Sequence, residues 1–381
     1  MREVWVLNYF ANVIPDVKFI PDNDNFVNLE FTVEEKSTQQ ANASVGYSAQ
    51  EGPIGNIGFS FANFSIKRPF QVGDGQNLSF QWYFGKYYRS FSLSFTEPWM
   101  FNTPTLGGFS IFDRRSGGGG LYTFELYERG GSITLGREFK WPDNYFNGQW
   151  TIRYSDNKVK NLEDNSVISP YYSSRNSTQV SVSQLIYRDS RNRPEFPTAG
   201  SVNTFLVKLA GGPLGGNEDF LKFIVNSEWY IPTYKGLVFY INNKVGWLHT
   251  IKAGSYVNPG ERFFIGGSGM GFAEGLRGYT ERFTMPNGGN ALAKFTTELR
   301  FPIAPNPTIF GLFFIEGGNA WSEFANADPF DLYRSAGVGV RLFMPMVGII
   351  GVDFGYGFDR VTDNPFINSG KWEVHFQFGK F

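Results

Sequence analysis

The sequence predicts an all-β protein: a sixteen-stranded antiparallel transmembrane β-barrel preceded by part of a small α+β domain. Apolar and polar residues alternate with period two over most of the chain, as at Leu78, Phe80, Trp82 and Phe84. Aromatic residues make up 18% of the 381 residues, yet the mean hydropathy is only −0.26. Barrel strands produce this combination, because one face meets lipid and the other meets water. No apolar run approaches the roughly 20 residues of a spanning helix.

The barrel is expected over residues 37–381, where alternating runs are separated by turn-rich gaps. Two short runs at 121–129 and 131–139 are candidates for one strand bent at Gly130-Gly131, and that merger brings the count to about sixteen, an even number as in single-chain bacterial barrels. The other strands are expected near 40–50, 55–66, 76–86, 89–99, 104–115, 146–158, 177–190, 199–210, 219–231, 236–247, 290–302, 307–317, 333–344, 348–359 and 370–381.

Residues 1–36 follow a different pattern. An amphipathic helix is expected over Glu3–Val13, followed by strands at Val17–Ile20 and Phe26–Val33. One helix and two strands are too few to bury a core, so this segment is interpreted as the back half of a domain. Met1 is followed directly by charged residues, without the apolar core of a signal peptide, and is interpreted as an added or truncated start.

Composition disfavours several functional classes. The net charge of −1 gives no reason to expect a nucleic-acid partner, and the absence of cysteine removes thiol chemistry and disulfides. His249 and His375 have no partner at metal-ligand spacing, so both are expected to be ordinary wall or loop residues. Ser116–Gly120 lacks the Lys-Ser/Thr of a phosphate-binding loop and is interpreted as a turn. No metal, cofactor or enzymatic activity is therefore expected.

A long Gly-rich connection over residues 248–289 is the candidate functional segment, because loops of this length are uncommon unless functional. Strand parity places five charged residues on the lumen face: Glu298, Arg300, Glu316, Arg341 and Asp353. If the loop folds back into the lumen, Arg277 can grip a carboxylate there with its planar guanidinium. Gly278 allows close backbone approach, and Tyr279 adds area with a polar tip. The alternative is an external loop with Arg277 in solvent.

Four motifs occur in a characteristic order. They are Arg188–Arg191 with Pro197–Gly200, Leu276-Arg277-Gly278-Tyr279, Phe314–Trp321, and Ser335–Arg341 with Pro345 and Asp353–Gly355. All four resemble motifs of the BamA family. The first resembles its D-x-R…P-T-x-G turn and the second its (V/I)RG(F/Y) loop motif. The third resembles its F-x-D-x-G-x-x-W strand and the fourth its penultimate strand pair. Glu316 stands where that family has Asp. Leu7–Phe10 and Val33–Lys36 look like the end of the last POTRA domain.

The resemblance implies POTRA domains followed by a sixteen-stranded barrel, and a function in folding and inserting other β-barrels. It implies Glu316 or Asp353 as the partner of Arg277, with Glu316 favoured. Unfolded β-barrel clients, accessory assembly lipoproteins and outer-membrane lipid are the implied partners, in the outer membrane of a Gram-negative bacterium. A two-partner secretion or autotransporter-assembly translocator of the same superfamily is the alternative. A passive porin is disfavoured by the organised loop.

The first and last strands are predicted to form a lateral gate. The first strand is poor in bulky side chains over Ala43, Ser44, Val45, Gly46 and Tyr47, so it offers few cross-strand contacts. An openable seam lets a client strand pair with the exposed edge. The alternative is a first strand that pairs weakly but does not act as a gate. The last strand alternates apolar and polar residues and ends in an aromatic residue. This pattern resembles the C-terminal signal that the assembly machinery reads. The residues of the last strand assigned to the gate and the signal are Trp372, Val374, Phe376, Phe378, Gly379 and Phe381.

Overall fold

The computed structural model describes most of the chain. The described residues are 10–20, 23–35, 39–48, 52–68, 73–86, 88–119, 122–161, 175–193, 196–252, 254–269, 273–280, 288–305, 308–344, 348–359 and 372–379.

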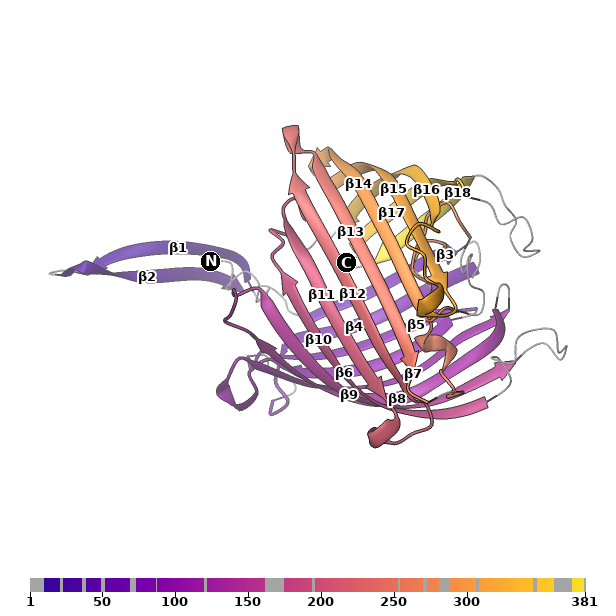
Figure 1. Cartoon of the computed structure of the whole chain (residues 1–381). Coiled ribbons are helices and arrows are strands. Elements are labelled where there is room, and N and C mark those ends of the chain that lie inside the picture. The colour runs from indigo at the N-terminus through magenta and orange to yellow at the C-terminus, as the bar shows by residue number, and fades with distance from the viewer. Residues whose placement is uncertain are drawn as a thin grey trace.

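Within these residues, β3 to β18 form one antiparallel sheet of sixteen strands, in which each strand pairs with its neighbours in the sequence. β18 and β3 are the two ends of this order, and the sheet curves into a barrel-shaped wall (Figure 1). The strands are β3 Gln39–Ser48, β4 Gly52–Phe64, β5 Gln76–Gly85, β6 Tyr88–Glu97, β7 Thr105–Gly119, β8 Tyr122–Glu138, β9 Phe146–Asn161, β10 Arg175–Asp189, β11 Gly200–Ala210, β12 Phe220–Pro232, β13 Val238–Thr250, β14 Ala291–Pro305, β15 Thr308–Trp321, β16 Tyr333–Met344, β17 Gly348–Gly357 and β18 Trp372–Gly379.

The two short runs around Gly130-Gly131 are a single strand, β8, which pairs with β7 and β9 along its length. Glycine is required inside this strand, since a Cβ on Gly130 would lie 2.1 Å from the carbonyl oxygen of Tyr154. The merged reading is therefore confirmed. The all-β class and the large antiparallel sheet are also confirmed, whereas closure of the sheet between β3 and β18 stays a prediction.

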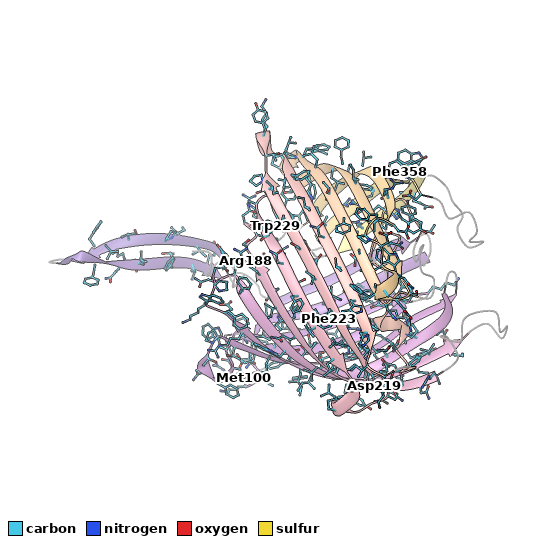
Figure 2. The ribbon with its side chains drawn as sticks, in the orientation of Figure 1. Met100, Arg188, Asp219, Phe223, Trp229 and Phe358 are labelled. Atoms are coloured by element: carbon cyan, nitrogen blue, oxygen red, sulfur yellow. The ribbon has the colours of Figure 1, made fainter. Side chains whose placement is uncertain are left out.

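The two faces of the wall differ in burial as the period-two pattern predicts. On β15, Phe313 and Ile315 are exposed, while Leu312, Phe314 and Glu316 between them are buried. Trp229 and Phe223 share the outward register on β12 (Figure 2). We call the face that carries Leu312, Phe314 and Glu316 the inner face. Apolar side chains on the other face suit contact with lipid.

The N-terminal segment is a β-hairpin that projects away from the wall (Figure 1). β1 Phe10–Ile20 pairs antiparallel with β2 Asn23–Glu35. The helix expected over Glu3–Val13 is therefore wrong from Phe10 to Val13. This segment pairs with β2 and continues the alternation seen at Val17 and Phe19. Residues 3–9 lie outside the described residues.

One face of this hairpin is apolar and mostly exposed, including Phe19 and Leu29. A two-stranded ribbon is only marginally stable alone, so this face suits a larger domain, which stays a prediction.

The described helices are 3-10 turns at strand ends and in the loop between β13 and β14. None of them is long and apolar enough to cross a membrane. They are η1 Met100–Asn102, η3 Gly212–Leu214, η4 Tyr234–Gly236, η5 Pro259–Glu261 and η6 Phe324–Asn326.

Candidate functional site

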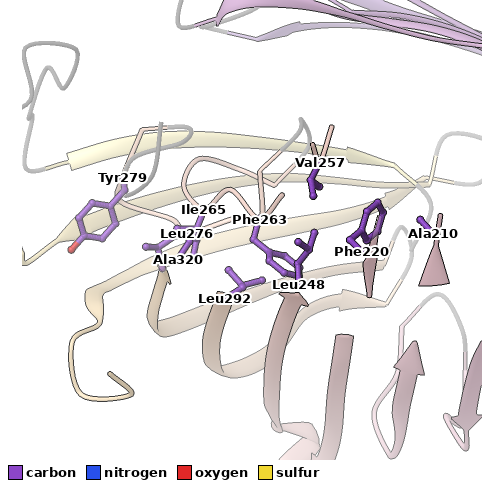
Figure 3. Close-up of a cluster of buried hydrophobic side chains, with 10 residues drawn as sticks. All are labelled: Ala210, Phe220, Leu248, Val257, Phe263, Ile265, Leu276, Tyr279, Leu292 and Ala320. Carbon is purple, nitrogen blue, oxygen red and sulfur yellow. The ribbon is translucent and has the colours of Figure 1, made fainter. Parts of the chain in front are cut away.

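The connection between β13 and β14 is called the inner loop, residues 251–290. Its described residues, 251–252, 254–269, 273–280 and 288–290, fold back onto the inner face of the wall. Isolated bridges join Ile265 to Glu274 and Gly267 to Leu276, and thereby give the loop its own backbone pairing. Ile265 and Leu276 are fully buried. Figure 3 shows the cluster that they form with loop and wall side chains, which comprises Ala210, Phe220, Leu248, Val257, Phe263, Ile265, Leu276, Tyr279, Leu292 and Ala320. Apolar burial thus holds the loop against β11–β15.

Arg277 lies among three carboxylates of the wall. Its Nη2 donates to Glu298 Oε1 at 2.7 Å and to Glu316 Oε1 at 2.8 Å, and its Nη1 lies 3.6 Å from Asp353 Oδ2. The backbone N–H of Arg277 also donates to Glu316 Oε2, at 2.8 Å. Glu316 therefore holds both the side chain and the backbone of the motif. All four residues are at least 95% buried.

The wall supplies further cations that balance these carboxylates. Arg341 makes a bidentate pair with Asp353 at 2.7 and 2.8 Å, and Arg300 Nε donates to Glu298 at 2.8 Å. Lys294 Nζ lies 3.7 Å from Glu316. Because every buried charge has an opposite charge beside it, the network avoids the cost of a stranded ion.

The backbone after Arg277 lies directly against β17. Gly278 has φ +88°, and a Cβ on Gly355 would lie 2.5 Å from its nitrogen. Its N–H donates to His375 Nε2 on β18 at 2.9 Å. Tyr279 Oη donates to the Arg334 carbonyl at 2.6 Å, and burial raises the pKa of this tyrosine to about 12. The motif thereby touches β16, β17 and β18.

Gly278→Ala is expected to loosen the inner loop more than Gly254→Ala. Both positions have left-handed φ, which costs alanine about 1–2 kcal/mol, but only at Gly278 would the new Cβ meet backbone, 2.8 Å from the Gly357 nitrogen. Gly254 has nothing within 4 Å. Hydrogen–deuterium exchange of residues 273–280 in the folded protein measures the effect. Equal exchange in the two variants would show that the close approach is unimportant.

A second anchor holds the first part of the inner loop. The carboxylate of Glu261 pairs with Lys208 and with Lys222. Burial alone favours the neutral acid, but the two ammonium groups lower the pKa of Glu261 well below its usual range. Neighbouring Glu218 is fully buried and accepts hydrogen bonds from Gln179 and Asn157, both at 2.9 Å. This anchor was not among the contacts expected from the sequence, although the inward parity of Lys208 and Lys222 is readable there.

The structure places the expected wall residues at unequal distances from Arg277. Glu316 contacts it directly, whereas Asp353 is mainly bound by Arg341. Glu298 was assigned to the lumen but not as a partner of Arg277, and it makes an equally close contact. His375 was expected to be an ordinary residue, yet it is buried and accepts a hydrogen bond from the loop motif.

The residues of the expected gate lie in β3 and β18. Trp372, Val374 and Phe376 are exposed on the outer face of β18. Ala43 to Tyr47 belong to β3 and pair through their backbone with β4. The side chains of Ala43–Tyr47 and Phe378, and the whole of Phe381, lie outside the described part of the chain.

Known proteins share this sequence pattern. The model of the Omp85 superfamily domain matches residues 71–381. The chain is 25% identical over 389 residues to the outer membrane protein assembly factor BamA of Nitratidesulfovibrio vulgaris, covering 98% of this chain and 45% of that protein. It is 23% identical over 347 residues to BamA of Neisseria meningitidis, covering 84% of this chain and 42% of that protein. The chain thus spans less than half the length of these relatives.

Solved structures share the fold. BamA from Haemophilus ducreyi lacking POTRA domains 1–3 matches with a TM-score of 0.73 at 20% identity, over 99% of this chain and 76% of that chain. CdiB from Acinetobacter baumannii matches with a TM-score of 0.61 at 14% identity, over 97% of this chain and 65% of that chain. The family resemblance of the sequence motifs is confirmed, and the chain belongs to the Omp85 superfamily, with BamA proteins among its relatives.

Proposed function

We propose that the chain is the barrel part of an outer-membrane assembly protein, which folds and inserts client β-barrels through a gate between β3 and β18. The observation that carries the proposal is the inner loop, whose Arg277 is bound by Glu298 and Glu316 on the inner face. A loop fixed inside the lumen narrows the passage, which does not suit a wide, passive pore. The BamA relatives supply the assembly role.

The gate is proposed at the two ends of the strand order. β18 has 8 residues, the fewest among the described strands of the sheet, and β3 has 10, as do β5, β6 and β17. Short strands with small residues such as Ala43 and Gly46 make few cross-strand contacts, each worth about 0.2–1 kcal/mol. A client strand satisfies the exposed backbone groups of such an edge by β-augmentation.

The remaining assignments follow from this role. Residues 1–36 are proposed as the end of the last POTRA domain and residues 37–381 as the barrel, in a bacterial outer membrane. The exposed apolar face of the hairpin supports a larger N-terminal domain. The proposed partners are unfolded β-barrel clients, accessory assembly lipoproteins and outer-membrane lipid. The role requires no catalytic group.

A translocator that passes its client across the membrane is the second candidate, because the resemblance implies that such proteins share the loop motif and the barrel. The relatives matched by sequence are named outer membrane protein assembly factors. Assembly is therefore the better supported function.

Reconstitution distinguishes these functions. Liposomes containing the protein are mixed with a urea-denatured eight-stranded barrel, and client folding is followed by its heat-modifiable mobility on gels. We expect faster client folding than in empty liposomes. Accumulation of client inside the vesicles would favour the translocator. A large, steady conductance in planar bilayers, with no acceleration of folding, would instead identify a pore.

A further inference from the structure

The hydrogen bond between Gly278 and His375 joins the inner loop to the last strand of the wall. His375 lies on the inner face of β18, is 5% exposed, and accepts the Gly278 N–H at 2.9 Å. Further hydrogen bonds of the motif reach Glu298 on β14, Glu316 on β15 and Arg334 on β16. The bond to His375 therefore extends loop docking to the strand at the end of the sheet order.

The geometry assigns a defined chemical state to this contact. An Nε2 atom that accepts a hydrogen bond belongs to a neutral imidazole with its proton on Nδ1. The donor is a backbone amide, which the close packing of Gly278 against Gly355 and Gly357 holds in place. If the imidazole moves away with β18, this buried N–H loses its partner, and leaving such a group unpaired is unfavourable.

The neighbour of β18 in the strand order is β17. β18 has 8 residues and pairs with β17 from Ile349↔Gly379 to Tyr356↔Trp372. His375 is in register with Asp353, the carboxylate bound by Arg341 and close to Arg277. The imidazole thus connects the middle of this short strand to the part of the wall where the loop motif is docked.

We propose that His375 is a positioning residue that couples the docked state of the inner loop to the position of β18. While the loop is docked, the Gly278 amide holds β18 against β17. When β18 moves to admit a client strand, the loop loses one of its contacts. Because coupling between two sites is reciprocal, undocking the loop also loosens β18. The link to client entry rests on the proposed function; the coupling itself does not.

Two substitutions separate the hydrogen bond from the bulk of the side chain. His375→Leu fills the space without an acceptor, and His375→Gln retains an acceptor at similar reach. His249→Leu is the matched control, because His249 is an exposed wall residue on β13. Heat-modifiable mobility first establishes that each variant is folded. His375→Asn keeps an acceptor with a shorter reach and serves as a second loss-of-bond variant if His375→Leu does not fold.

Hydrogen–deuterium exchange of β17–β18 peptides and of loop residues 273–280 gives the two readouts. His375→Leu is expected to accelerate both by about fivefold, the effect of one net hydrogen bond of about 1 kcal/mol. His375→Gln and His249→Leu are expected to stay near wild type. Exchange in β10–β12 is expected to be unchanged, because the anchor at Glu261 remains.

A double-mutant comparison tests reciprocity. Arg277→Ala is expected to accelerate β18 exchange in the wild-type background but to add little in the His375→Leu background. Unchanged β18 exchange in His375→Leu, equal effects of the Leu and Gln variants, or full additivity with Arg277→Ala would overturn the proposal. These readouts involve no client. Failure of client assembly with intact coupling would therefore count against the proposed function alone.

Discussion

Arg277→Ala is expected to release the inner loop from the wall and to abolish most client assembly. The substitution leaves the buried carboxylates of Glu298 and Glu316 without the cation that contacts both. Removing one partner of a buried ion pair costs about 3–5 kcal/mol. Lys294 lies 3.7 Å from Glu316 and compensates only in part. Loop protection is measured by hydrogen–deuterium exchange of residues 273–280, and assembly by the folding rate of a client in liposomes.

Arg277→Lys is expected to fall between wild type and Arg277→Ala, because an ammonium is a point charge and lacks the planar fork of a guanidinium. Arg129→Ala is the control. It also removes an arginine from an ion pair, with Asp113, but this arginine side chain is 70% exposed. Exposed pairs contribute about 0–1 kcal/mol. Wild-type assembly together with unchanged loop protection in Arg277→Ala would contradict the prediction that Arg277 holds the inner loop against the wall.

A disulfide across the seam is expected to stop client assembly until it is reduced. Cysteine pairs introduced within 41–47 of β3 and 372–378 of β18 are screened for oxidation. The wild-type chain has no cysteine, so no background bond competes. A disulfide keeps two Cα atoms about 4.4–6.8 Å apart, and strands tied this closely cannot expose their edges to a client. The measurement is client folding in liposomes before and after reduction.

Ser110→Cys with Ser132→Cys supplies the matched control. These residues are partners on β7 and β8, and their hydroxyl oxygens are 2.9 Å apart. This lock lies away from the seam and is expected to leave assembly unchanged. If assembly continues in a seam variant whose disulfide is verified on gels, the lateral gate is wrong. If the control lock also stops assembly, the effect reflects a general need for a deformable wall.

Period-two alternation predicted the strands well because it is a local property of a wall with two different environments. The same parity placed Glu298, Glu316 and Asp353 on the inner face. The prediction was wrong at the N-terminus, where a helical period was expected up to Val13. Pairing of Phe10–Val13 with β2 determines the conformation there, and a single-segment pattern does not record its partner.

The candidate site was predictable in kind but not in detail. A loop arginine and a lumen carboxylate were recognisable as complementary charges. The choice among carboxylates depends on which strands lie beneath the loop tip, and this follows from the curvature of the sheet. The same applies to His375, whose inward parity was readable but whose partner is 97 residues away.

The sequence by itself determined the strand pattern, the inner and outer faces of the wall and the membership in the Omp85 superfamily, because alternation and motifs are carried by neighbouring residues. Only the tertiary structure decided which groups meet: Arg277 with Glu298 and Glu316, Arg341 with Asp353, Glu261 with two lysines, and Gly278 with His375. These contacts join segments far apart in the chain, and their geometry arises only when the sheet curves around the loop.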